Sequence, residues 1–470
     1  MPERVARKIK QAAAPEAHCP LPRALEEIAQ NAVRQALAQG ASGAECTAME
    51  GDEFSATVRL REVEQVKEAG SRGAGLRILI GKRVGSAYTS DLTADGIRQM
   101  VRSALEVASI TTEDPHAGLP DPEDLGSLNG DLALYHDDVA ALETAYKIGQ
   151  AAEAEEAALS VDPRIANSEG ASFDTHLSRR AFANSLGFSG AYSTSTCSLA
   201  AIPVAKDGDS MERDYWYTVA RSAARMEPPA EVGRIAAQRA LRRLHARKAP
   251  TQKVPVVFEP RAARTLLEHI FEAVHGEAIY RKASFLAGKL GEQVASENVT
   301  VIDDGMLAGL FGTSPFDDEG VPSRRTVVIE RGVLKSYLLN SYTARRLGMR
   351  TTGNASRGLS GNAGVGHGNL YLEKGEKPPE EILKSISRGL YVTELMGFGV
   401  NIVTGDYSRG ATGLWIENGE LAYPVSEVTI ASTLPRMLMN MEMVGADLEF
   451  RGSVAAPTML IHEMTLSGQG

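Results

Sequence analysis

The sequence predicts an α+β fold, with mixed helices and strands in the N-terminal half and a sheet-rich C-terminal domain. In the N-terminal half, the apolar spacing switches between the period of about 3.6 that is typical of helices and the period of two that is typical of half-exposed strands. From about residue 299 onward, short alternating segments separated by turns predominate. The chain has 470 residues, 43% hydrophobic and 23% charged, so it can bury a substantial core.

The first part of the chain is predicted to comprise a loose extension (1–20) and an α/β section (21–110). The extension combines charges and prolines without apolar periodicity. In the α/β section, Pro22 is suited to a helix start and Gly40 to its end. The expected elements are, in order, a helix between these two residues, strands at 54–60 and 76–80, and a helix after Thr93.

A stretch rich in Pro, Asp and Gly (111–136) is predicted to connect this section to a second α+β section (137–247). The strands expected there are rich in Ser, Thr and aromatic residues, which is typical of antiparallel strands with one solvated face. The expected elements are a helix at 138–157, strands at 176–186, 190–204 and 213–220, and an Arg-rich helix at 231–246.

The remaining residues (248–470) are predicted to form the sheet-rich domain. A short apolar strand at 254–258 precedes a helix opened by Pro260. Two hairpin turns are expected further on, one through Glu330-Arg331-Gly332 and one through Asn418-Gly419. The second is the stronger signal, because Asn-Gly favours the type I′ turn that joins two strands directly.

Composition narrows the class of protein. Sixty acidic residues against 50 basic ones give a formal charge of −10, which argues against a nucleic-acid binder. The three cysteines (Cys19, Cys46, Cys197) are far apart and show no metal-ligand spacing, so a reducing compartment without disulfides is expected. No secretory leader and no apolar run of membrane-spanning length is apparent. These observations predict a cytoplasmic protein without nucleic-acid or membrane partners.

The helix opened by Pro260 carries the candidate site. In a helical projection, Glu268, Glu272 and His275 fall within a sector of roughly 60° at the border of the apolar arc, and His269 points away from them. Two carboxylates and an imidazole on consecutive turns could bind a divalent cation or act as acid and base. The alternative is the polar flank of an amphipathic helix. The arc expected to be buried consists of Leu267, Ile270, Phe271 and Val274.

Two other motifs are interpreted as turns. The acidic runs Asp303-Asp304 and Asp317-Asp318-Glu319-Gly320 lack the ligand spacing of a metal-binding loop and are expected to lead into the strand at Thr326. The glycine-rich run Gly364–Gly368 lacks the strand-then-helix context of a dinucleotide-binding loop. It is expected to be a flexible turn before the strand at Leu370.

Long segments of the C-terminal half resemble a known family. The resemblance covers that half densely, whereas the N-terminal half matches mainly in layout. The segments are Gly276–Val294, Asp318–Thr326 followed by Glu330–Leu338, and Val403–Glu420 followed by Tyr423–Ala431. In these motifs the chain resembles the TldD/PmbA proteins. Within that family it is similar to the PmbA/TldE-type subunit.

The resemblance implies a pair of homologous subunits. The TldD-type subunit carries an HExxxH zinc motif on a helix, with a cysteine near the C-terminus as a further ligand, and the metal activates water for attack on a peptide bond. An ungapped alignment through Arg281-Lys282 places the two motif histidines on Glu268 and Ala273 and the motif glutamate on His269. No cysteine follows Cys197. The resemblance therefore implies no catalytic residue, cofactor or metal in this chain, and zinc in the TldD-type partner.

The resulting hypothesis is a TldE/PmbA-like subunit, inactive alone, that pairs with a TldD-type metallopeptidase. Together they would enclose a chamber where unfolded peptides are cut, as in peptide maturation and antitoxin degradation. An extended peptide could add to a sheet edge through main-chain hydrogen bonds. Two alternatives stay open: a self-sufficient metal-dependent peptidase using Glu268, Glu272 and His275, and a non-catalytic homodimeric module that binds peptides.

Overall fold

The structure, a computed structural model, describes residues 22–468. The extension expected at 1–20 lies outside the described residues. Helices and strands are mixed throughout, and strands predominate in the C-terminal part, which confirms the predicted α+β class. No helix within 22–468 is both long and apolar enough to cross a lipid bilayer.

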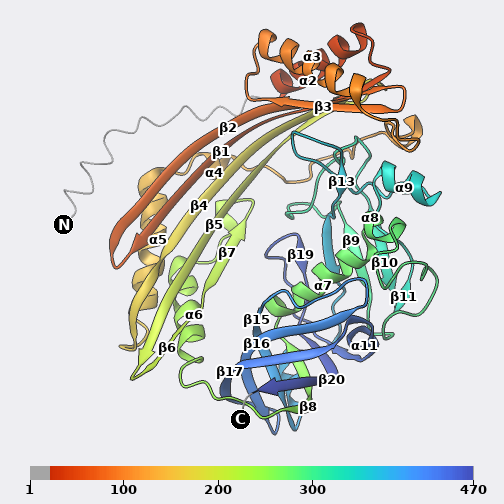
Figure 1. The fold of residues 1–470 in the computed structure, drawn as a ribbon. Coiled ribbons are helices and arrows are strands. Elements are labelled where there is room, and N and C mark those ends of the chain that lie inside the picture. The colour runs from red at the N-terminus through yellow and green to blue at the C-terminus, as the bar shows by residue number, and fades with distance from the viewer. Residues whose placement is uncertain (1–21, 469–470) are drawn as a thin grey trace.

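One curved antiparallel sheet dominates the N-terminal half. Its order is β3-β2-β1-β4-β5-β6, and β7 also pairs with β5. Because β1 pairs with β4, the sections predicted at 21–110 and 137–247 share this sheet. Figure 1 shows its four long strands bending over the C-terminal part. The strands are β1 (Gly43–Arg59), β2 (Glu62–Ile80), β3 (Arg83–Thr89), β4 (Ile165–Asn184), β5 (Ser189–Asp207), β6 (Ser210–Arg213) and β7 (Trp216–Ala220).

Helices cover one face of this sheet. Because side chains alternate between faces, the face that bears Phe173 and Leu199 packs against helices at one end, in a cluster that includes Ala154 and Val232. A second cluster lies under two further helices at the other end. The helices are α2 (Arg23–Ala38), α3 (Ala94–Ile110), α4 (Asp137–Ala140), α5 (Thr144–Leu159) and α6 (Pro229–Leu241), with short 3₁₀ turns at Pro122–Asp124 and Ala223–Arg225.

The opposite face of the curved sheet, here named the inner face, looks toward the C-terminal part. Ser55, Asp174 and Ser198 lie side by side on it. Arg180, on the same face of β4, makes an ion pair with Asp318 of the C-terminal part (2.7 Å). The inner face is therefore polar, and near this ion pair it carries a contact between the two halves.

Two larger sheets build the C-terminal part. The first has the order β17-β16-β15-β8-β20-β18, and an additional pairing of β17 with β20 closes five of its strands into a ring. The second has the order β11-β10-β9-β14-β19, and β12 and β13 form a small separate pair. The strands are β8 (Gln252–Phe258), β9 (Val301–Asp304), β10 (Arg325–Glu330), β11 (Val333–Leu334), β12 (Ala355–Ser356), β13 (Gly364–Val365), β14 (Asn369–Leu372), β15 (Arg388–Met396), β16 (Asp406–Glu417), β17 (Glu420–Thr433), β18 (Met441–Val444), β19 (Val454–Ala455) and β20 (Met459–Gly468).

Helix α7 (Pro260–Val274) lies between these two sheets and contacts β8 and β15 of the first and β14 and β19 of the second. Leu266, Leu267 and Ile270 are among its fully buried side chains. Each such side chain stabilises the fold by roughly 1.5–3 kcal/mol. The other helices are α8 (Gly276–Tyr280), α9 (Ser341–Leu347), α10 (Pro379–Lys384) and α11 (Leu434–Met439).

Candidate functional site

The three residues predicted as a candidate site lie at the C-terminal end of α7. Glu268 and Glu272 are on the helix, but α7 ends at Val274, and His275 has extended backbone angles (φ −62°, ψ 126°). The N–H of Leu338 donates to the carbonyl of Val274 (3.1 Å), and the N–H of Gly276 donates to the carbonyl of Leu338 (2.9 Å). This pairing takes His275 out of the helix, so the projection that grouped it with the two glutamates was wrong.

His275 acts locally as the N-cap of α8. Its Nδ1 accepts a hydrogen bond from the N–H of Glu277 (3.2 Å). Its ring meets the ring of Phe271 edge to face, with centroids 5.6 Å apart. Burial lowers the pKa of this imidazole, and the nearby Glu277 carboxylate acts in the opposite direction. His275 thus satisfies a helix N-terminus.

His269 is the imidazole closest to Glu272. Its Nδ1 lies 3.7 Å from Oε2 of Glu272, because residues three apart are neighbours on a helix surface. The prediction that His269 points away from the glutamates was therefore wrong. Its ring is also edge to face with Tyr407 of β16 (centroids 6.2 Å), and neither ring nitrogen makes a hydrogen bond among the described residues. Burial lowers the pKa of His269, Glu272 opposes this effect and Arg409 adds to it.

The side chains on α7 and the described cysteines do not fit a zinc site of the HExxxH type. At the position aligned with the second motif histidine stands Ala273, whose methyl group cannot ligate and is fully buried in the core. Cys46 and Cys197 are buried in the curved sheet, and burial raises the pKa of each thiol to about 12. Within residues 22–468, no three His, Cys, Asp or Glu side chains come close enough to hold a metal ion.

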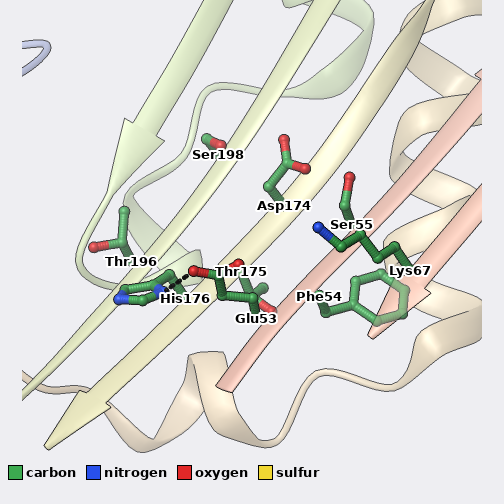
Figure 2. Close-up of a pocket in the computed structure, with 9 residues that line it drawn as sticks. All are labelled: Glu53, Phe54, Ser55, Lys67, Asp174, Thr175, His176, Thr196 and Ser198. Atoms are coloured by element: carbon green, nitrogen blue, oxygen red, sulfur yellow. Dashed lines mark ion pairs between the residues drawn. The ribbon is translucent and has the colours of Figure 1, made fainter. Parts of the chain in front are cut away.

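A shallow pocket of about 290 Å³ lies at the middle of the curved sheet (Figure 2). Asp174 and Ser55 are direct cross-strand neighbours on the inner face, and His176 makes an ion pair with Glu53 (3.4 Å) beside them. Lys67 of β2 completes this polar row. Acceptors and donors alternate along it, so the surface can hydrogen-bond a polar chain that lies across the strands.

Sequence reasoning did not single out this pocket. The signal was present, because polar residues recur at every second position from Ser172 to Ser178 on one strand and from Thr194 to Ser198 on the next. Such alternation predicts a solvated sheet face, but the pairing that aligns the two strands is a long-range property of the fold.

Models of one protein family match most of the chain. The PmbA/TldA metallopeptidase domain 1 matches residues 44–108, the central domain matches 137–244 and the C-terminal domain matches 251–468. The metalloprotease PmbA of Escherichia coli O157:H7 is 40% identical, over 95% of this chain and 96% of that protein. A metalloprotease PmbA homolog of Haemophilus influenzae is 37% identical, over 94% and 96%.

Solved structures share the whole fold. A crystal structure from Bacteroides thetaiotaomicron, named as a proposed modulator of DNA gyrase, is 27% identical with a TM-score of 0.88 and covers 94% of this chain and 99% of its own. TldE from Thermococcus kodakarensis has a TM-score of 0.83 and covers 94% of this chain and 100% of its own. At 22% identity, this second likeness shows the fold alone. The chain therefore belongs to the PmbA/TldD metallopeptidase family and has the fold of its TldE-type members.

Proposed function

We propose that this chain is the TldE-type companion of a TldD-type zinc peptidase. It holds no zinc of its own, pairs with the TldD-type subunit and helps to enclose the space in which unfolded peptides are cut. Cleavage then depends on the partner's zinc, and this chain contributes scaffold and peptide-contacting surface. The natural setting is peptide maturation or degradation of small, poorly folded proteins such as antitoxins.

The observation that supports this proposal most strongly is the chemistry of α7. The aligned ligand positions hold a glutamate and a buried methyl group, at Glu268 and Ala273, and the aligned general base is replaced by His269. Zinc in catalytic sites takes three protein ligands and keeps one position for water. A helix that offers one carboxylate where two imidazoles are needed cannot supply that set.

Two surfaces support contact with an extended peptide or with a partner strand. Residues 62–73 of β2 pair with β1 on one side, and among the described residues β3 covers β2 only from Ala74 onward. Such an edge presents main-chain donors and acceptors without sequence preference. The polar inner face, with Asp174 and His176, is the second surface.

Co-expression with the TldD-type protein of the same genome tests the proposal. We expect light scattering to give the summed mass of both chains, and unfolded casein to be cleaved by the mixture but not by this chain. Unchanged elution of the chain in the partner's presence contradicts the pairing. Chelator-sensitive cleavage by this chain alone contradicts the companion role.

The two alternatives predict different results. A self-sufficient peptidase loses activity in the variants Glu272→Ala and His275→Ala, whereas Glu153→Ala on the exposed side of α5 serves as control. Under our proposal the first two variants leave the activity of the mixture unchanged. A homodimeric binding module shows twice the chain mass with or without the partner.

A further inference from the structure

A second cavity, of about 190 Å³, lies where the curved sheet meets the C-terminal part. It is lined by Arg180 and Tyr192 of the sheet and by loops around β9, β12 and β13, including Asp303, Arg324 and His367. Its volume lies below the roughly 300–1,000 Å³ of typical small-molecule pockets. Any resident of this cavity is therefore smaller than a typical drug-sized ligand.

Asp303 is the group in this cavity that lacks a full set of partners. Asp303 is 2% exposed and lies near the end of the buried strand β9. Oδ2 accepts a hydrogen bond from Nδ2 of Asn354 (2.7 Å), whereas Oδ1 makes no hydrogen bond of good geometry among the described residues, although the backbone N–H of Gly368 lies close enough to lower the pKa of this carboxyl. A buried carboxylate oxygen without a donor costs free energy, so it is usually met by water or a ligand.

The neighbouring acidic side chains have hydrogen-bond or ion-pair partners within the protein. Asp317 accepts three backbone hydrogen bonds, from Glu319, Val321 and Ala355, each 2.9 Å long. Asp318 is neutralised by Arg180 across the junction (2.7 Å). The unmet acceptor in the cavity is thus specific to Asp303 and does not follow from a general excess of acids.

A cation without an acidic partner lines the same cavity. Arg324 is exposed and makes no ion pair with any acidic residue among those described. The Nδ1 of His367 lies 2.8 Å from the carbonyl oxygen of Gly368, which fixes the orientation of this ring in the cavity wall. The cavity therefore offers a buried negative group and a positive group nearer the solvent.

Glycines form part of the wall, where segments of the chain pack closely against one another. A Cβ at Gly312 would lie 2.2 Å from the carbonyl oxygen of Gly368, and a Cβ at Gly366 would lie 2.8 Å from Cβ of Ser356. Close backbone packing therefore requires glycine at these positions. The run Gly364–Gly368, interpreted from sequence as a flexible turn, includes the short strand β13 and lines this cavity.

We propose that this cavity binds a small zwitterion, with its ammonium group on Asp303 and its carboxylate on Arg324. A free amino acid and a dipeptide share this chemistry. A metal ion fits less well, because no third ligating side chain joins Asp303 and His367 among residues 22–468. A simple anion fits less well because the buried carboxylate repels it. The inference does not depend on the proposed pairing with a TldD-type subunit.

Titration calorimetry of the purified full chain tests the proposal. The probes are L-alanine and glycylglycine, and the controls are glycinamide and N-acetylglycine, which lack the carboxylate and the ammonium group respectively. We expect one of the two zwitterions to bind at millimolar concentration or tighter, and each control probe to bind at least tenfold more weakly. Preference for alanine identifies a free amino acid as the resident, and preference for glycylglycine identifies a dipeptide.

Variants connect binding to the two charges. Asp303→Asn and Arg324→Gln are each expected to weaken binding of the preferred zwitterion at least tenfold, and Glu153→Gln on the exposed side of α5 is expected to leave it unchanged. Arg324 is exposed, so its variant folds even if the buried substitution disturbs the structure. Absence of zwitterion binding, binding by both variants as tight as by the natural chain, or binding of Zn²⁺ alone that Asp303→Asn abolishes would each overturn the proposal.

Discussion

Burial of the Asp303 carboxylate lowers the stability of the folded chain at neutral pH. Burial raises its pKa to about 6, and the hydrogen bond from Asn354 and the nearby His367 act less strongly in the opposite direction. The folded state therefore binds the proton more tightly than the unfolded chain does. The associated stability is fully present below the unfolded pKa, near 3.8, and is lost as the pH rises through about 6.

The variant Asp303→Asn is expected to remove this dependence. Relative to the variant, the natural chain should lose on the order of 2–3 kcal/mol of unfolding free energy between pH 4 and pH 7, at about 1.4 kcal/mol per pKa unit. Urea unfolding at both pH values measures the difference. Other buried acids such as Glu319 are common to both proteins and cancel. A difference that does not change with pH would contradict the raised pKa.

At the scale of single residues, the sequence shows which side chains are present, but it seldom shows which groups surround them in the fold. The interpretation of Asp303-Asp304 as a turn was wrong, since both lie in the buried strand β9. Charged residues carry no strand signal, and Asn369, which contacts the Asp304 carbonyl (2.7 Å), is 65 positions away. By contrast, Cys197 lies in a segment rich in Ser and Thr with no neighbouring histidine, which predicts a buried, unreactive thiol, and its burial is confirmed.

Among the elements, the hairpins were predictable because their signals are local. Asn418 and Gly419 both have positive φ (51° and 83°) between β16 and β17, as the type I′ turn requires. Arg331 and Gly332 connect β10 and β11 in the same way (45° and 81°). Both hairpin predictions are confirmed.

Two elements were mispredicted because distant contacts define them. Only the residues at 76–80 of β2 were expected to form a strand, whereas β2 is 19 residues long. Its first half is exposed and lacks an apolar face, so periodicity gives no signal there. The end of α7 before His275 likewise depends on the pairing of His275 with Leu338, which no local sequence motif predicts.

The contact of β2 with the loop before β13 gives a prediction for an element. A Cβ at Gly75 would lie 1.8 Å from the carbonyl oxygen of Leu359, so Gly75→Ala must displace backbone. We expect a loss of roughly 1–3 kcal/mol in unfolding free energy, as for other overpacked sites. Gly70→Ala on the same strand is the matched control, because its nearest neighbour is 3.8 Å away. Equal stability of the two variants in urea would contradict this packing.

At the scale of the whole molecule, the two halves are held together by buried ion pairs. Oε1 of Glu45 on the curved sheet accepts hydrogen bonds from Arg77 of the same sheet (3.0 Å) and from Arg357 of the C-terminal part (2.6 Å). All three side chains are at most 8% exposed. At the other end, Glu259 binds Arg239 across the junction (2.6 Å).

Glu45→Ala should therefore destabilise the entire chain. Two guanidinium groups, on Arg77 and Arg357, would be left buried without this carboxylate, at a cost of about 3–5 kcal/mol. Differential scanning calorimetry is expected to show a lower melting temperature. Glu64→Ala, which removes an exposed ion pair with Arg59, should change stability by less than about 1 kcal/mol. A similar small effect of both variants would show that this junction contributes little.

The hypothesis that α7 lacks a zinc site rests on the family resemblance of the C-terminal half and stays a prediction. The cavity around Asp303 was not predictable from the sequence, because its lining comes from segments as distant as Arg180 and His367. Likewise, the shared curved sheet follows from the pairing of β1 with β4, which adjoins segments more than 100 residues apart. Patterns along the chain predict elements, whereas sites between elements require the assembled structure.

Metal content is the most direct test of the central claim, that α7 of this chain does not hold zinc. The isolated chain is dialysed against micromolar zinc at neutral pH and analysed by mass spectrometry of the metal, beside a TldD-type protein as positive control. We expect well below 0.1 zinc per chain here and about one in the control. Roughly one tightly held zinc per chain, lost in Glu268→Ala or His269→Ala, would contradict this claim.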